Sequence, residues 1–126
     1  MMTDFSMNNI ANDWEMMSFV RHNKTVGDEY LVPTKMQDFR LVTGAPIYGD
    51  YKSTPYIDTD VLDWHRRQRV AGKFYRTIDF DLLAEIVLED GITHVVLEAN
   101  IPAPPCSFLH ELHQDDHYKI FIINIP

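Results

Sequence analysis

The pattern of apolar and polar residues along the first third of the chain predicts one helix followed by two short strands. Ile10 and Trp14 begin an apolar stripe with helical spacing, which predicts an amphipathic helix over residues 8–22. Residues 29–33 and 39–43 are instead short runs with the composition of strands. We expect these two runs to pair as an antiparallel hairpin.

The middle of the chain predicts a loop, a helix and a strand. Residues 44–56 contain glycine and proline at short intervals, which disfavours both regular structures. Aspartates at the start of 58–71 can cap a helix, and Gly72 stands where a left-handed residue would end it. Residues 73–78 then have the composition of a strand.

The clearest pattern in the sequence is a helix that begins after Asp79 and runs to Asp90. Asp79 is a suitable N-cap, and Gly91 is a suitable terminator. The helix has a stripe of apolar residues and an opposite acidic face with acids at every fourth position. The apolar stripe consists of Leu82, Leu83, Ile86 and Val87, and the acidic face of Asp81, Glu85 and Glu89.

The last third predicts a strand at 93–101, a short helix at 107–114 and a final strand at 117–125. The final strand is apolar on both faces, so we expect it to be central in a sheet or paired across a subunit interface. With the strand at 73–78, this gives a βαβαβ order for the C-terminal half.

These elements predict an α+β fold in a single compact domain spanning residues 1–126. We expect a mixed β-sheet of about four to six strands with about three to four helices. No repeat, low-complexity tract or linker divides the chain.

Composition narrows the class of protein. The net charge is −8, and 45% of the residues are hydrophobic, as in globular proteins. No run is apolar and long enough for a membrane span, and the N-terminus lacks the features of a signal peptide. We therefore expect no membrane partner and a cytoplasmic location, with which the single cysteine is consistent.

The positive charge is concentrated in one segment, residues 64–76. It holds five of the eleven Lys and Arg residues and none of the Asp and Glu residues. With the aromatic side chains between them, these cations suit nucleic acid, a nucleotide, a phosphorylated ligand or an acidic protein surface. The alternative is that Arg66 and Arg67 pair with Asp63 while the aromatic side chains pack inward. The candidate phosphate-binding cations are Arg66, Arg67, Arg69, Lys73 and Arg76.

Two other regions suit contact with a protein partner. The loop at 44–56 carries tyrosines among Gly, Ser and Asp, a composition typical of binding surfaces. The acidic face of the helix at 79–90 suits a partner with a basic surface. The candidate partner-binding residues are Tyr48, Tyr51, Tyr56, Asp81, Glu85 and Glu89.

No catalytic, metal or cofactor site is predicted. The nearest candidate is a group of one cysteine and three histidines, residue types that bind zinc. Their spacing along the chain matches no known zinc finger or zinc ribbon. Activation of the cysteine by a histidine is a weaker alternative. Motifs for phosphate loops, serine hydrolases and HExxH metalloproteases are absent. The candidate zinc-binding residues are Cys106, His110, His113 and His117.

The composition is similar to that of small phage-encoded inhibitors and bacterial immunity proteins, which are compact and acidic. That similarity implies a binding protein that inhibits or masks a macromolecular partner, and a homodimer is the default assembly. The alternatives are a small enzyme acting on a phosphorylated or nucleotide ligand held by residues 64–76, and a structural or assembly protein.

Overall fold

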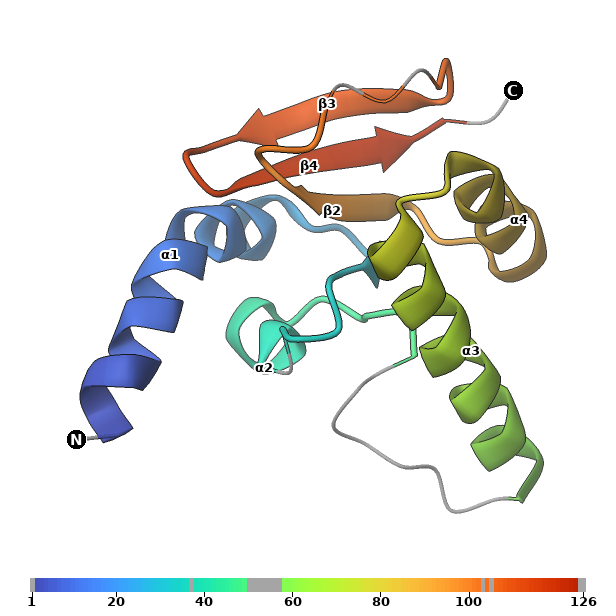
Figure 1. The fold of residues 1–126 in the computed structure, drawn as a ribbon, viewed down its shortest axis with the longest axis horizontal. Coiled ribbons are helices and arrows are strands. Elements are labelled where there is room, and N and C mark those ends of the chain that lie inside the picture. The colour runs from blue at the N-terminus through green and yellow to red at the C-terminus, as the bar shows by residue number, and fades with distance from the viewer. Residues whose placement is uncertain (1, 37, 50–57, 103, 105, 125–126) are drawn as a thin grey trace.

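The computed structural model describes residues 2–36, 38–49, 58–102, 104 and 106–124. Within them the chain forms four helices and a four-stranded sheet (Figure 1). The elements in chain order are α1 (Met2–Asn23), β1 (Tyr30–Leu31), α2 (Phe39–Thr43), α3 (Asp58–Thr77), α4 (Phe80–Asp90), β2 (His94–Glu98), β3 (Leu109–Gln114) and β4 (Tyr118–Ile123). The expected α+β class is confirmed.

The sheet is mixed and has the strand order β1-β2-β4-β3. β1 pairs with β2 in parallel, whereas β2 with β4 and β3 with β4 are antiparallel. β4 therefore has a neighbour on both sides, which confirms that the doubly apolar C-terminal strand is central. Because its backbone groups are paired on both edges, its apolar residues can be buried without leaving an open ladder.

Helices cover both faces of the sheet. Consecutive residues of β2 point to opposite faces, and both are buried. Val96 packs into one core with Met16 and Val20 of α1, and Val95 into a second core with residues of α3 and α4. In Figure 1, α1 lies at the left of the molecule and α3 and α4 at the right. The second core includes Ala71, Phe74, Leu83, Ile86 and Phe121.

α4 has the bounds and the buried face that its sequence predicts. The carboxylate of Asp79 accepts hydrogen bonds from the N–H groups of Asp81 and Leu82, at 2.9 and 3.4 Å. Gly91 ends the helix with a φ of 73°. Leu83 and Ile86 are buried, so the helix is anchored by caps at both ends and by its apolar stripe.

The predicted break at Gly72 is wrong, and so is the strand at 73–78. α3 continues through Gly72 to Thr77. Ala71 and Phe74 are both fully buried against α4 and the sheet, so the helical period of buried residues passes through the glycine. This burial outweighs the cost of about 1 kcal/mol for a glycine inside a helix.

The hairpin predicted from 29–33 and 39–43 is also wrong. Residues 39–43 form α2, in which Phe39 and Thr43 lie one turn apart and are buried. The hydroxyl of Thr43 donates to the carbonyl of Phe39 at 2.7 Å. β1 is bordered instead by the chain after α2, since the N–H of Tyr30 donates to the carbonyl of Pro46 at 2.9 Å.

The helix predicted at 107–114 is a strand, β3, and the βαβαβ order is therefore wrong. β3 gains the ladder of hydrogen bonds to β4, which outweighs the helical preference of its sequence. The turn to β4 is closed by Asp115, whose Oδ1 accepts the N–H groups of His117 and Tyr118 at 2.8 Å each. β3 has an irregular register between Glu111 and His113.

Candidate functional site

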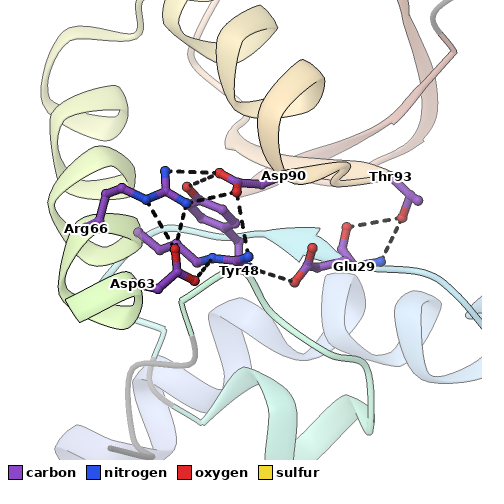
Figure 2. A network of polar contacts seen from close by, with 7 residues as sticks. Glu29, Tyr48, Asp63, Arg66, Asp90 and Thr93 are labelled. Atoms are coloured by element: carbon purple, nitrogen blue, oxygen red, sulfur yellow. Dashed lines mark hydrogen bonds and ion pairs between the residues drawn. The ribbon is translucent and has the colours of Figure 1, made fainter. Parts of the chain in front are cut away.

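Two of the five cations in segment 64–76 belong to an internal ion-pair network (Figure 2). Nη2 of Arg66 donates to Oδ1 of Asp63 and to Oδ1 of Asp90, at 2.9 Å each. Arg67 forms ion pairs with Asp63 at 2.8 Å, Asp90 at 3.6 Å and Glu29 at 3.7 Å. These contacts confirm that Arg66 and Arg67 pair with Asp63, so a ligand at either arginine would have to compete with acids that are already in contact.

Asp90, at the last turn of α4, is the centre of this network. Its side chain is only 6% exposed, and its Oδ2 accepts the hydroxyl of Tyr48 at 2.8 Å. Burial raises the pKa of Asp90, but hydrogen bonds from Arg66 and Tyr48 outweigh burial and leave this pKa below its usual range. The carboxylate is therefore ionised and fully partnered.

The network connects three parts of the chain. Glu29 precedes β1, and its N–H donates to the hydroxyl of Thr93, before β2, at 2.8 Å. The guanidinium of Arg67 lies 5.3 Å from the ring centroid of Tyr48. Burial is the main cause that raises the pKa of Glu29, with Arg67 opposing it. These residues hold α3 against the end of α4 and the loop after α2, which is a structural role.

The remaining cations of the segment lie on one exposed face of α3. Arg69, Lys73 and Arg76 are spaced at i, i+4 and i+7 and are all exposed. Phe74 and Tyr75 do not form a stacking surface beside them. Phe74 is fully buried, and the hydroxyl of Tyr75 donates to backbone carbonyls of β1 and of Val96 in β2.

A pocket of about 470 Å³ lies beside this basic face. Its polar lining includes Arg76 and Lys35, and Lys35 is paired with Glu98 at 3.1 Å. Ile78 also lines the pocket and has a φ of 48°, a backbone conformation that costs energy for a β-branched residue. The remaining walls are Pro33, Thr34, Gly72, Tyr75 and Ile101.

A second, more polar pocket of about 310 Å³ borders the other side of the Lys35–Glu98 pair. Burial raises the pKa of Asp13, which is hydrogen-bonded to the hydroxyl of Tyr118. The remaining lining residues are Asn12 and His117. Sequence reasoning missed both pockets, because their residues come from segments far apart that carry no shared motif.

The acidic face of α4 is where the sequence predicts it. Asp81, Glu85 and Glu89 are all exposed. Leu88 lies on the same face, one turn after Glu85, with 74% of its surface exposed. Glu89 is 3.8 Å from Arg66 at the edge of the face. Charge and an exposed apolar side chain therefore occur together on one rigid helix.

Of the three tyrosines predicted to bind a partner, the structure describes Tyr48. Tyr48 is fully buried and holds Asp90, so it is not part of a contact surface. Tyr51 and Tyr56 lie outside the described residues.

The zinc-type residues of the sequence do not gather into one site. Cys106 precedes β3, His110 is exposed on it, and His117 is exposed in the turn to β4. Burial raises the pKa of the Cys106 thiol, which is the opposite of what an activated nucleophile requires. Within the part of the chain that the structure describes, His113 alone of the four lies in a cluster of metal-binding side chains, with Glu15 and Asp115.

No described helix combines the length and the apolar composition that a membrane span requires. Residues 11–71, just under half of the chain, match a family described as a domain of unknown function, DUF6798. The matched region runs from within α1 to within α3 and includes Glu29, Tyr48, Asp63, Arg66 and Arg67. Neither the curated proteins nor the solved structures contain a match.

Proposed function

We propose that this protein is a binding domain that masks a basic surface on a partner protein, and that the outer face of α4 makes the contact. The observation that carries the proposal is the exposure of Leu88 among Asp81, Glu85 and Glu89. Acidic side chains around an apolar one suit a partner pocket that is apolar at its centre and basic at its rim.

The rigidity of α4 supports this proposal. Asp79 and Gly91 cap its ends, Leu83 and Ile86 anchor its inner face, and Asp90 holds its last turn against α3. A contact face that does not have to become ordered on binding loses less conformational entropy. The net charge of −8 adds a field that attracts a basic partner over longer distances.

The test is affinity capture with two variants of equal charge. Glu85→Lys with Glu89→Lys reverses the acidic face, and Glu111→Lys with Asp116→Lys reverses two exposed acids of the β3–β4 hairpin. We expect a stoichiometric basic partner to be captured by the wild type and by the hairpin variant, and to be lost with the α4 variant. Retention of the partner by the α4 variant would reject this face as the contact.

A second candidate function is the binding of a small anionic ligand in the 470 Å³ pocket. It keeps the phosphorylated or nucleotide ligand expected from segment 64–76 and places it on Arg76 and Lys35, the two cations that line this pocket. Glu98 lines the same pocket and pairs with Lys35, so an anionic ligand has to displace this exposed ion pair. The strained backbone of Ile78 at the pocket favours this candidate, because such strain concentrates at ligand sites.

Adenosine monophosphate is a suitable probe for the pocket. In an NMR titration we expect amide shifts around Lys35, Gly72 and Ile78, lost in Arg76→Ala and retained in Arg69→Ala. Shifts spread evenly over the basic residues would mean nonspecific charge attraction and would reject the pocket.

Self-association and a cytoplasmic location remain predictions from the sequence. β4 is paired on both sides and so offers no free edge for a second subunit. The edge that a second copy could use is β3, where Leu112 is 43% exposed. Light scattering across a wide concentration range tests for a dimer, and a monomer mass throughout would exclude it.

A further inference from the structure

We propose that Glu15, His113 and Asp115 form a binding site for one divalent transition-metal ion of the zinc class. The three residues come from α1, from β3 and from the turn after β3. Each offers one ligand atom, and the three atoms lie within 4.8 Å of one another. This site shares no residue with the α4 face or with either pocket, but it adjoins the 310 Å³ pocket, because Asp115 accepts the N–H groups of His117 and Tyr118.

The two residues of the hairpin are already held in place. The side chain of Asp115 is only 2% exposed, and its Oδ1 accepts the N–H groups of His117 and Tyr118. Its other oxygen, Oδ2, lies 2.9 Å from Nε2 of His113. The buried carboxylate is therefore aimed at the imidazole by the backbone of the turn rather than by solvent.

The imidazole of His113 is fixed from the other side by α1. Its ring stacks on Phe19, with ring centroids 4.7 Å apart and an interplanar angle of 27°. The side chain is 17% exposed, so a hydrated ion can still reach it. Phe19 and Glu15 lie one helical turn apart on α1, which places Glu15 on the same side as the imidazole.

Glu15 is exposed and is the only one of the three that has to move. A rotation of its side chain would bring its carboxylate closer to the other two ligand atoms, as a metal shell of about 2.0–2.2 Å per ligand requires. The closed set would contain one imidazole nitrogen and two carboxylate oxygens, which zinc accepts, with water at the fourth position. Two carboxylates also balance the charge of a dication.

The sequence predicts no metal site because the spacing of Cys106, His110, His113 and His117 fits none. The proposed site uses only His113 of that group, and its third ligand lies on α1, far away in the sequence. No local spacing rule could have connected Glu15 with the hairpin.

Titration of the chelator-treated full chain with zinc and with cobalt tests the site. In calorimetry we expect one equivalent of zinc to bind. With cobalt we expect a visible absorption band typical of four-coordinate Co²⁺, which disappears when zinc displaces the cobalt. Glu15→Gln should weaken zinc binding by about tenfold or more, since even outer-shell changes cost that much. This variant changes an exposed helical residue, so circular dichroism should show an unchanged fold.

His110→Ala is the matched control, because His110 is an exposed histidine on the same strand but outside the cluster. We expect its zinc affinity to equal that of the wild type, whereas His113→Gln should lose the cobalt band. Absence of stoichiometric zinc binding would overturn the proposal. So would binding that Glu15→Gln and His113→Gln leave unchanged, which would assign the zinc to other surface histidines.

Discussion

The hydroxyl of Tyr48 donates a 2.8 Å hydrogen bond to Asp90, across 42 residues of sequence. Tyr48 is fully buried and the Asp90 side chain is 6% exposed, so this bond is largely shielded from water. It joins the loop after α2 to the end of α4. The stability of the network therefore depends on a contact that neither local sequence indicates.

Replacing Tyr48 with phenylalanine should destabilise the fold by about 1–3 kcal/mol, because a buried carboxylate loses a donor. Urea denaturation monitored by circular dichroism measures the change. Tyr30→Phe is the control, since Tyr30 is equally buried and its hydroxyl has no hydrogen bond within the described residues. Equal losses in both variants would mean that packing, not the bond to Asp90, determines the cost.

Replacing Arg66 with alanine should cost on the order of 2 kcal/mol, because its hydrogen bonds join two charged groups, one of them buried. Arg69→Ala removes the same side chain from the exposed face of α3 and should change stability by less than about 0.5 kcal/mol. The same denaturation experiment compares the two. Equal unfolding free energies of the two variants would show that the contacts of Arg66 in the network of Figure 2 contribute no stability.

The helix α4 shows what the sequence could predict and why. Its apolar stripe, its cap at Asp79 and its stop at Gly91 all indicate the same helix, and no tertiary contact opposes them. The segment 73–78 is the opposite case. Its β-prone composition and the preceding glycine indicate a strand, but burial of Phe74 against α4 decides the outcome. Local patterns succeed where packing agrees with them.

The candidate sites divide in the same way. The exposure of Asp81, Glu85 and Glu89 follows from helical period alone. The fate of Arg66 depends on Asp90, which lies on another helix, and the cluster of His113 depends on Glu15 at the far end of the chain. Contacts between such distant residues depend on how the helices and strands are arranged in space. The predicted βαβαβ order was wrong, so it could not indicate these contacts.

Leu83→Ala should destabilise the fold by about 2–4 kcal/mol, because it removes a fully buried side chain from the core between α4 and the sheet. Glu85→Ala, two residues later on the exposed face, should cost little. Denaturant midpoints of the two variants give the comparison. Similar midpoints would contradict the orientation of α4.

The unfolding free energy should decrease as the pH falls below about 6.5, because burial lowers the pKa of His94 from its ordinary value of 6.5. In that range the unfolded chain binds a proton that the folded chain excludes, so the stability present above pH 6.5 is lost on acidification. Asp28 opposes this shift, and Thr93 and Tyr30 contact the imidazole.

His94→Gln removes this group, so the slope of stability against pH between about 7 and 5 should become smaller even if overall stability is lower. Denaturation at several pH values measures both slopes. An unchanged slope would show that His94 does not contribute to the acid sensitivity. Asp90 adds a separate loss only at lower pH, because its pKa lies below its ordinary value of 3.8.

If the outer face of α4 attracts a basic partner, the association rate constant should fall steeply with added salt, since exposed charges are screened over about 8 Å at physiological ionic strength. Glu85→Lys with Glu89→Lys should slow association more than it speeds dissociation, and should flatten the dependence on salt. Leu88→Ser should instead speed dissociation, because it removes apolar contact without changing charge. Surface plasmon resonance with the captured partner separates the two rates. A salt-independent association rate, or equal effects of the charge and leucine variants on dissociation alone, would mean that the field of the acidic face does not guide the encounter.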